Sequence, residues 1–262
     1  MVKVFDLTGK EKGQIDLPSS FATPIREDII KRAVLALQST KRQAYGTNKL
    51  AGLRTAAHYH GVKDKRGSMK NKEIARGPRT HGSNGGQEWR MRRIPQTVGG
   101  RRAHPPKAEK IWKQKVNKKE MILAIKSAIS ATGNKELVEN RGHIFTCALP
   151  LIASDEINSV KTLKDIKKFL IELKFEDELK RGEKKKVRSG KGKSRGRKYK
   201  RKKSILFVST DSNLKKAVSN IPGCDFRCLK CLTVEDLAPG TVPGRLTIWT
   251  EGAVKKIGEL YG

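Results

Sequence analysis

Apolar residues recur along the chain with a period of either two or 3.6 residues, and the N-terminal stretch shows the period of two. Val2–Leu7 alternates apolar and polar residues, which predicts a strand. A turn at Thr8–Lys10 follows, and Gln14–Leu17 is the expected antiparallel partner strand. The first elements predicted are therefore two short paired strands.

Two stretches show the helical period of 3.6 residues with terminal signals. Thr23 and Pro24 suit the first positions of a helix whose apolar stripe continues to about Thr40. Asn117 and Glu120 have the spacing of a capping box, and they open a second apolar stripe that ends at Gly133. We expect a helix in each stretch.

Strand-like and helix-like segments continue to alternate toward the C-terminus. The predicted strands are His143–Ala153, Ser204–Ser209, Asp225–Leu229 and Arg245–Trp249. The predicted helices are Thr162–Leu173, Asp211–Val218, Val234–Leu237 and Glu251–Tyr261. This alternation predicts an α/β body with a mainly parallel sheet, and 262 residues suffice for one such core.

Two segments show neither period and carry almost all the net charge. Residues 41–119 hold 22 Lys and Arg against 4 acidic residues, and residues 180–203 hold 15 against one. Their net charges of +18 and +14 equal the +32 of the whole chain, so the remainder is neutral. We expect one domain over residues 1–262, with 41–119 as a long internal extended basic loop and 180–203 as a second basic arm.

This charge distribution indicates a polyanionic partner, for which nucleic acid is the first candidate. A membrane surface would need regular amphipathic helices, but Gly and Pro interrupt both basic segments. No run of 18 apolar residues occurs, and Asp6 lies where a signal sequence needs apolar residues. The sequence thus indicates a soluble, cytoplasmic protein with no membrane partner.

Enzymatic signatures are weak. Lys191–Ser194 reads KGKS, but a phosphate-binding loop needs Gly at the position of Val187. No Ser/His/Asp or paired-carboxylate arrangement stands out, and the acids of Glu172–Glu178 resemble a solvated helix end. An RNA-directed enzyme with a nucleotide-binding body remains the alternative, and a DNA-compacting protein is a weaker third reading.

Possible metal ligands form incomplete sets. Cys224, Cys228 and Cys231 have a zinc-compatible spacing but lack a fourth neighbour, so Cys228 and Cys231 are better explained as small buried residues at a sheet edge. His58 and His60 could face one metal on an extended chain, but no carboxylate neighbours them and an RNA-facing role is favoured. We expect no metal and no cofactor.

The basic segments carry chemistry suited to RNA. The Arg guanidinium makes bidentate hydrogen bonds to phosphate and can also stack on bases. Aromatic rings stack on bases too. In the first segment these residues are Trp89, Arg90, Arg92, Arg93, Arg101, Arg102, His104 and, bracketing them from the C-terminal side, Trp112. The second segment resembles low-complexity sequence and predicts general anion binding through Lys191, Lys193, Arg195, Arg197, Lys198, Tyr199, Lys200 and Arg201.

Several long motifs resemble one family. The stretch RIPQTVGGRRAHPPKAEK at Arg93–Lys110, GKGKSRGRKYKRK at Gly190–Lys202, and PGRLTIWTEGA at Pro243–Ala253 are similar to the large-subunit ribosomal protein four family of archaeal and eukaryotic type. KVFDLTG near the N-terminus and NKKEMILAIKSAISATG at 117–133 resemble it too. The similarity covers nearly the whole chain.

The resemblance implies a structural, non-enzymatic component of the large ribosomal subunit. It implies a three-layer αβα body and a long loop that threads ribosomal RNA, supports assembly and lines the nascent-peptide exit tunnel. RNA contacts are implied for Arg54 and for the stem at Arg93–Lys110, which includes Lys107 and Lys110. The implied partners are large-subunit RNA, neighbouring ribosomal proteins and the nascent peptide. The loop tip is expected within Lys65–Trp89, where the sequence departs most from the family pattern.

Overall fold

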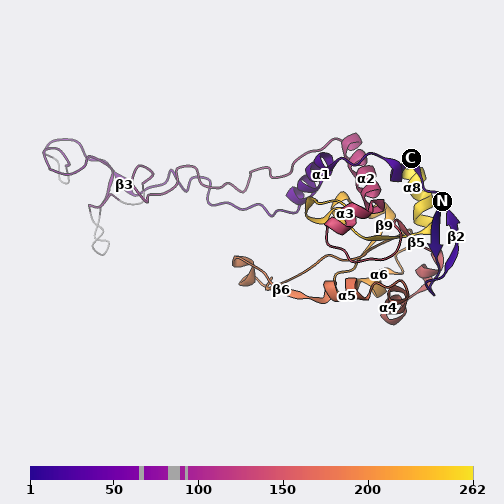
Figure 1. The fold of residues 1–262 in the computed structure, drawn as a ribbon. Coiled ribbons are helices and arrows are strands. Elements are labelled where there is room, and N and C mark those ends of the chain that lie inside the picture. The colour runs from indigo at the N-terminus through magenta and orange to yellow at the C-terminus, as the bar shows by residue number, and fades with distance from the viewer. Residues whose placement is uncertain (65–67, 82–88, 92–93, 262) are drawn as a thin grey trace. The chain divides into compact units, whose positions relative to one another are not determined.

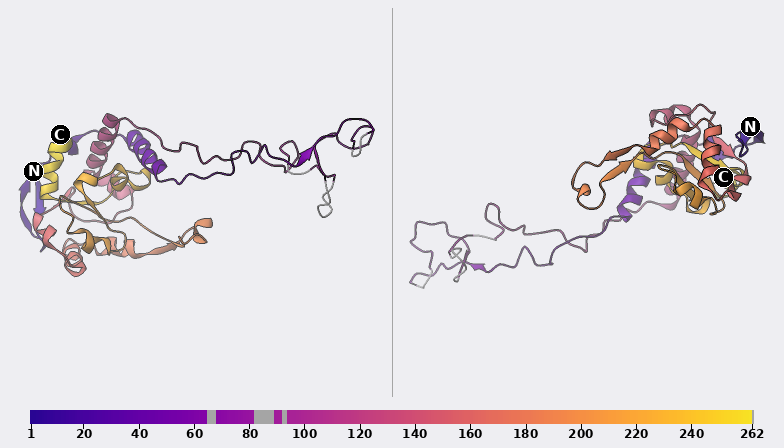
Figure 2. Two further views of the ribbon diagram at one scale, coloured as in Figure 1. Left: turned by 180° about the vertical axis from the view of Figure 1, so that it is seen from behind. Right: turned by 90° about the horizontal axis from the view of Figure 1, so that it is seen from below.

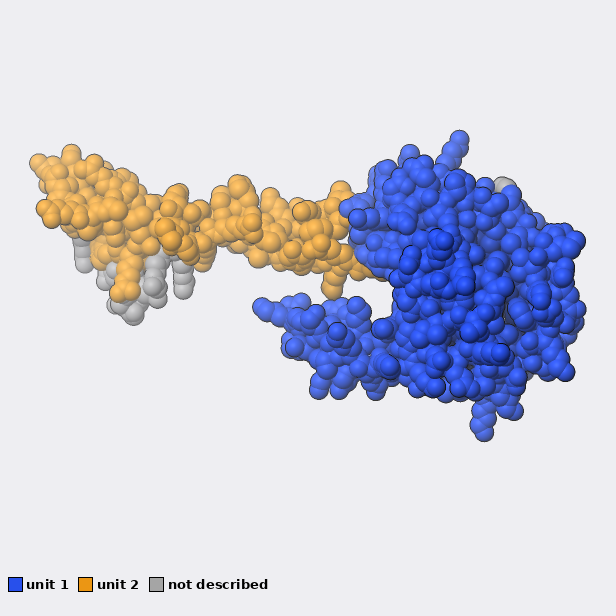
Figure 3. All heavy atoms as spheres, viewed as in Figure 1, with its two compact units in different colours: residues 1–40, 113–262 blue, residues 41–112 orange. Residues whose placement is uncertain are grey.

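The computed structural model describes residues 1–64, 68–81, 89–91 and 94–261 (Figure 1). Contacts divide the chain into two units, which Figure 3 shows in blue and orange. Unit 1 comprises residues 1–40 and 113–262, and unit 2 comprises residues 41–112. Within the described ranges, none of the helices combines the length and apolar character needed to cross a bilayer.

Unit 1 is built on a six-stranded sheet. The strand order is β2 (Glu11–Ile15), β1 (Val2–Phe5), β5 (Leu151–Ala153), β10 (Thr247–Thr250), β8 (Leu206–Ser209) and β9 (Asp225–Cys228). Every neighbouring pair is parallel except β1 and β2, which are antiparallel. The predicted α/β class with a mainly parallel sheet is confirmed.

The strand register separates two sets of apolar side chains. Trp249 pairs with Ile152 on one neighbouring strand and with Val208 on the other. Side chains of directly paired residues point to the same face, and their chain neighbours point to the opposite face. Ile152, Val208 and Trp249 accordingly belong to one buried cluster, whereas Leu151 and Phe207 belong to another.

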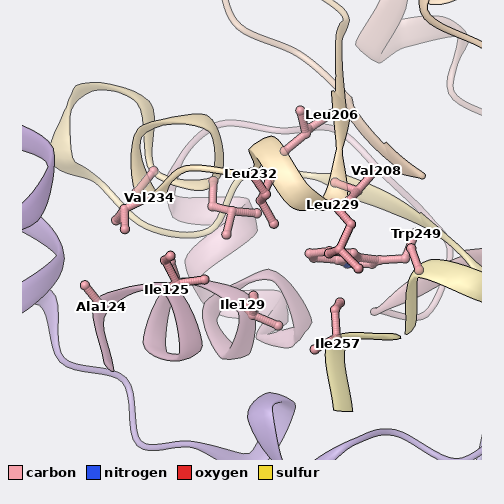
Figure 4. Packing of buried hydrophobic residues seen from close by; sticks show 14 of the residues in the cluster. Ala124, Ile125, Ile129, Leu206, Val208, Leu229, Leu232, Val234, Trp249 and Ile257 are labelled. Carbon is pink, nitrogen blue, oxygen red and sulfur yellow. The ribbon is translucent and has the colours of Figure 1, made fainter. Parts of the chain in front are cut away.

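Helices pack against each of these clusters. The cluster around Trp249 includes residues of α1 (Glu27–Thr40), α2 (Lys118–Gly133), α7 (Val234–Leu237) and α8 (Glu251–Tyr261). The cluster around Phe207 includes residues of α3 (Lys135–Asn140), α4 (Leu163–Glu172) and α6 (Lys215–Ser219). Figure 4 shows Ile129 of α2 and Ile257 of α8 gathered on one side of the Trp249 indole.

Tertiary contacts shift the beginning of α1 and take the place of the predicted cap of α2. α1 begins at Glu27 rather than at Thr23, and the backbone N–H of Arg26 donates to Ser127 Oγ of α2 at 2.6 Å. α2 begins as expected after Asn117, but the Asn117 side chain makes no capping hydrogen bond. The predicted capping box is therefore wrong, and Glu120 instead forms an ion pair with Arg32 of α1 at 2.9 Å.

Several strands are shorter than predicted or shifted. Of the run His143–Ala153, only Leu151–Ala153 forms a strand, β5. Earlier in the run, the Ile144 N–H donates to the Glu178 carboxylate at 3.1 Å, and Pro150 has no N–H for a ladder. The partner of β1 is Glu11–Ile15 rather than Gln14–Leu17. Likewise, α6 begins at Lys215 rather than near Asp211, and β10 begins at Thr247.

Two small antiparallel pairs complete the strands of the described residues. In unit 2, β3 (Ala57–His58) pairs with β4 (Arg79–Thr80). In unit 1, α5 (Glu176–Glu183) leads into a hairpin of β6 (Lys185–Val187) and β7 (Tyr199–Arg201). The views in Figure 2 show this hairpin extending away from the main sheet of unit 1.

Candidate nucleic-acid interface

Two legs of unit 2 run beside one another, residues 44–55 and residues 101–112. The Thr47 N–H donates to the Pro106 carbonyl at 3.1 Å, and Arg101 Nη1 donates to the Arg54 carbonyl at 3.0 Å. Lys49 and Glu109 form an ion pair between the same legs. These contacts bring Arg54 and Arg101, predicted RNA-binding residues 47 positions apart, to one place.

Glycine permits the close approach of the legs. A Cβ on Gly46 would lie 2.3 Å from the Ala108 nitrogen, and a Cβ on Gly52 would lie 2.1 Å from the Ala103 oxygen. Both atoms belong to backbone, which cannot rotate away as a flexible side chain can. Any larger residue at either position would force the legs apart.

Two grooves between the legs gather basic side chains. The first, of ≈ 590 Å³, is lined by Tyr45, Arg102, His104, Pro105, Pro106, Lys107, Glu109, Lys110 and Trp112. The second, of ≈ 660 Å³, contains Arg54 and Lys107 among its lining residues. Arg54, Arg101, Arg102, His104, Lys107 and Lys110 are all exposed, so their charged or polar heads are available to a ligand.

Trp112 is already engaged within unit 2. Its ring stacks with Tyr45 at a centroid distance of 5.9 Å, and the Arg42 guanidinium lies 3.7 Å from its centroid. Lys110 Nζ lies 4.4 Å from the same ring. Cations over an indole face are attracted by the ring quadrupole, so this group stabilises the groove wall. Because Tyr45, Arg42 and Lys110 already contact the Trp112 ring, this arrangement favours a structural role for Trp112 over the base stacking that the sequence predicts.

Trp89 adopts an uncommon backbone conformation beside β4. Its φ angle is +62°, which bulky residues rarely adopt. The Trp89 N–H donates to the Thr80 carbonyl at 2.9 Å, while Arg79 Nη1 donates to the Trp89 carbonyl at 2.8 Å. The indole meets the His81 ring edge to face at 4.6 Å. Trp89 is half-buried, and Arg90 beside it is exposed.

The second basic segment is more ordered than its composition suggests. Lys186 pairs with Lys200 and Val187 with Tyr199, so the segment folds as a hairpin. All eight of its predicted RNA-binding residues, from Lys191 to Arg201, are exposed. Tyr199, Lys200 and Arg201 also line a groove of ≈ 440 Å³ whose other wall is residues 219–225. Like charges held this close favour binding of a polyanion.

A buried carboxylate anchors both ends of this hairpin. Glu178 is fully buried and accepts hydrogen bonds from Arg181 Nη2 at 2.6 Å and from Ser204 Oγ at 2.7 Å. His143 Nδ1 lies 2.7 Å from the same carboxylate oxygen and donates to it. Arg181 Nη2 also donates to the Lys203 carbonyl at 2.9 Å. The chain entering the hairpin is thereby tied to the chain leaving it.

The environment of Glu178 keeps it ionised. Burial acts to raise the pKa of Glu178, but hydrogen bonds from His143, Arg181 and Ser204 outweigh burial and lower the pKa to about 2. Burial lowers the pKa of His143 below its ordinary value, against the opposing attraction of Glu178. At neutral pH the cluster therefore contains a carboxylate, a guanidinium and a neutral imidazole.

A second ion pair, between buried Arg245 and half-buried Asp225, fixes the end of the hairpin to the sheet. Arg245 is almost fully buried and donates to Asp225 Oδ2 at 2.6 Å and to the Ser204 carbonyl at 2.9 Å. Lys203 Nζ lies 2.8 Å from the same Asp225 oxygen. Burial acts to raise the pKa of Asp225, but the charges and hydrogen bonds of Arg245 and Lys203 outweigh it and lower the pKa.

The sequence matches the model of the ribosomal protein L4/L1 family over residues 15–260. It is 46% identical over 263 residues to the large ribosomal subunit protein uL4 of Archaeoglobus fulgidus, covering 98% of each chain. It is also 45% identical, again over 98% of each chain, to the proteins of that name from Methanococcoides burtonii and Methanocaldococcus jannaschii. The chain belongs to the ribosomal protein L4/L1 family.

For this family member, the structure gathers part of the predicted RNA-binding set. Arg54 and Lys107 share one groove, and Arg102, His104, Lys107 and Lys110 share another. Trp89 and Arg90 lie beside β4, and the hairpin residues belong to unit 1. Arg92 and Arg93 lie outside the described residues, as do residues 65–67 and 82–88 of the expected loop tip.

Other sequence interpretations need correction in this L4/L1 family chain. Glu178 is not part of a solvated helix end but the centre of a buried cluster. Cys224 is buried, but Cys228 is only half-buried and Cys231 is exposed, so Cys231 is not the buried residue expected at the edge of β9. Cys228 Sγ donates to the Thr210 carbonyl at 3.1 Å, which uses its polar group locally.

Sequence reasoning missed the residues that hold the hairpin. Glu178 precedes the basic segment, and Arg181 follows it at the spacing of one helical turn, which favours an ion pair. His143 lies 35 residues earlier, so its contact with Glu178 depends on the tertiary fold. The Glu178–Arg181 spacing is the one sign of this cluster in the sequence. It does not stand out because many other charged residues surround it.

Proposed function

We propose that the chain is a structural constituent of the large ribosomal subunit and binds large-subunit ribosomal RNA through its two basic segments. Family membership gives the ribosomal context, since its relatives are named as large-subunit ribosomal proteins. The observation that supports the RNA contacts most directly is the gathering of Arg102, Lys107 and Lys110 in one open groove. Its role is structural rather than catalytic, and as part of the ribosome it works in the cytoplasm.

We further propose that the chain acts as one α/β ribosomal-protein domain with a three-layer body. Residues 41–119 thread between RNA segments as a long basic loop, support assembly, and line the nascent-peptide exit tunnel with their far end. The body contacts neighbouring ribosomal proteins. Helices against both buried clusters support the layered body, and the net charge of +18 over residues 41–119 supports a path lined by phosphates.

The binding mechanism follows from charge and backbone shape. Lys107 and Lys110 neutralise phosphates as point charges, while Arg54, Arg101 and Arg102 offer planar donor forks that match phosphate oxygens. Each neutralised phosphate releases condensed counterions, which drives association. The hairpin residues Lys191, Lys193, Arg195, Arg197, Lys198, Lys200 and Arg201 bind in the same way at a second place, where Tyr199 offers a ring that stacks on bases.

A charge-matched pair of variants tests this function. The groove variant replaces Arg54, Arg102, Lys107 and Lys110 with Gln, all of which line a groove. The control replaces the exposed Lys161, Lys164, Lys168 and Lys256 with Gln. Both lose four positive charges, so any difference reports position rather than net charge. Binding to large-subunit RNA is measured across a salt series.

The groove variant is expected to reduce the slope of log affinity against log salt by about 3, at about 0.7–0.9 per lost phosphate contact. The control is expected to change the slope by less than about 1. Equal slopes for the two variants contradict the proposal. Saturable nucleotide binding by the purified protein would favour the alternative of an RNA-directed enzyme.

A further inference from the structure

Three histidines of unit 2 meet at β3 and β4. We propose that His58, His60 and His81 form a binding site for a divalent transition-metal cation of the zinc type. Their possible ligand nitrogens all lie within 4.8 Å of one another. Among the residues that the structure describes, no other group of three His, Cys, Asp or Glu side chains is placed to hold a metal.

The pairing of the two short strands brings His58 and His81 together, and a bend of the chain adds His60. His58 pairs with Arg79, so their side chains share one face. His81 lies two residues after Arg79, so it returns to that face as the diagonal neighbour of His58. In this antiparallel register an extended chain would carry His60 away from His81, so the chain bends after His58 and brings the His60 ring within 4.4 Å of the His81 ring. The Met69 N–H donates to the His60 carbonyl at 2.8 Å and holds the end of β3 in place.

The distances fit a site that closes slightly on binding. The ring centroids are 4.5 Å apart for His58 and His60, 4.2 Å for His58 and His81, and 4.4 Å for His60 and His81. Zinc–nitrogen bonds of about 2.0–2.1 Å in a tetrahedron place ligand nitrogens about 3.3–3.4 Å apart. The imidazoles therefore need to approach by no more than about 1.5 Å.

The surroundings of His81 point to a ligand. His81 Nε2 is buried and has no hydrogen-bond partner. Buried polar atoms without a partner are costly, and a metal would satisfy this nitrogen. The Trp89 indole packs edge to face against the ring, and the strained Trp89 backbone is clamped to Thr80 and Arg79. Strain of this kind is characteristic of functional sites.

The donor set selects the class of ion. Neutral imidazole suits Zn²⁺, Cu²⁺ and Ni²⁺, whereas Mg²⁺ and Ca²⁺ prefer oxygen ligands. Three His ligands with a fourth position open to water are one of the known zinc arrangements. His58 is exposed, which leaves an entry path for the ion and room for the water.

The cysteines are the competing zinc ligands. Burial raises the pKa of the Cys224 thiol to about 12, which disfavours the thiolate that zinc needs. Cys228, Cys224 and Cys231 also do not form a group with metal-ligand distances. The test must nevertheless separate the two sets, because exposed Cys231 could bind zinc adventitiously.

The experiment measures binding of Zn²⁺ to the purified full chain by chelator competition, and the bound metal after dialysis by elemental analysis. The variants are His58→Gln and His81→Gln. His104→Gln is the matched control, since it lies in the same unit outside the cluster and is exposed. Cys231→Ser tests the thiol. Far-UV circular dichroism and denaturant unfolding verify that unit 1 stays folded in each variant.

We expect one equivalent of Zn²⁺ in the unaltered chain and in the His104→Gln and Cys231→Ser variants. Each cluster variant is expected to bind more than about 100-fold more weakly, because changes to groups that only support a ligand already cost about 10–100-fold. The complex with Co²⁺ should lack a thiolate charge-transfer band. No bound zinc, equal binding by His81→Gln, or loss of binding in Cys231→Ser would each overturn the proposal.

Discussion

The carboxylate of Glu178 joins three segments of unit 1 that are far apart in the sequence. It receives hydrogen bonds from His143, from Arg181 on its own helix and from Ser204 beyond the hairpin. Ionised groups taken out of water need such complete satisfaction, since an unpaired buried charge is strongly unfavourable. The cluster therefore fixes where the β6–β7 hairpin leaves the body.

Replacing Glu178 with Gln is expected to destabilise unit 1 by about 3–5 kcal/mol, the cost of breaking a buried ion pair from one side. Arg181 would keep its charge without its partner. Asp177→Asn is the matched control, because Asp177 pairs with Lys180 in an exposed bridge on the same helix. Exposed bridges contribute about 0–1 kcal/mol. Urea unfolding of both variants measures the difference, and equal losses would contradict a central role for Glu178.

The same cluster predicts a loss of stability in acid. Burial lowers the folded-state pKa of His143, so below about pH 6.5 the unfolded chain binds a proton that the folded chain does not. The pKa of Glu178 is also lowered, to about 2, so its contribution is complete above about pH 4.5 and is lost as the pH falls toward 2. The free energy of unfolding should therefore be constant near pH 7 and should decrease in two overlapping stages as the pH is lowered.

His143→Asn separates the stages, because the Asn amide can still donate to Glu178 but does not titrate. This variant should lose the decline that begins near pH 6.5 and keep the one below about pH 4.5. Unfolding free energies measured at half-unit pH intervals would show it. An unchanged profile in the variant would assign the upper stage to another group.

At the scale of elements, the two legs of unit 2 are in direct backbone contact at Gly46 and Gly52. Gly52→Ala should weaken RNA binding without altering the stability of unit 1, because the added Cβ would meet the Ala103 oxygen at 2.1 Å and separate the legs. Gly13→Ala is the control, as a Cβ on Gly13 meets nothing within 4 Å. Affinity for large-subunit RNA and urea unfolding report the two effects. Equal affinity in both variants would show that leg spacing is unimportant.

Sequence periodicity identified elements better than it identified their ends. The stripe of α2 was predicted from Ile125 and its neighbours because burial of one helix face leaves a clear pattern. The capping box failed because Glu120 pairs with Arg32 on another helix, a contact that local spacing cannot reveal. The hairpin went unpredicted because Lys186 and Lys200 pair through backbone, and their side chains follow no apolar alternation.

The candidate site could be predicted in type but not in arrangement. Charge and the family resemblance predicted a set of RNA-binding residues, and three of them, Arg102, Lys107 and Lys110, share an open groove. The sequence offered no sign that Arg42 covers the Trp112 ring. The meeting of His81 with His58 and His60 depends on the pairing of β3 with β4 and on a bend of the chain after His58, and neither leaves a readable pattern in the sequence.

At the scale of the whole molecule, the two units should differ in local stability. Unit 1 encloses both large buried clusters, whereas the hydrogen bonds of unit 2 lie mostly at exposed residues. Without RNA and zinc, backbone amides of residues 41–112 should exchange rapidly with deuterium, while α1 and α2 exchange slowly. Slow exchange throughout unit 2 would contradict this, and added Zn²⁺ should slow exchange near residues 57–60 and 79–81 alone.

The chain leaves unit 1 after α1 and re-enters it close by, since the Gln114 N–H donates to Ser39 Oγ at 3.0 Å. Folding of unit 1 must therefore close a loop of 72 residues, 41–112. Closure entropy grows with the logarithm of length, so a five-residue Gly/Ser bridge in place of 41–112 should stabilise the body by about 2 kcal/mol. Urea unfolding of this shortened chain measures the gain. In polymer terms, residues 41–112 are a tether fixed at both ends, and the entropy lost in closing this tether lowers the stability of unit 1 before any ligand is bound.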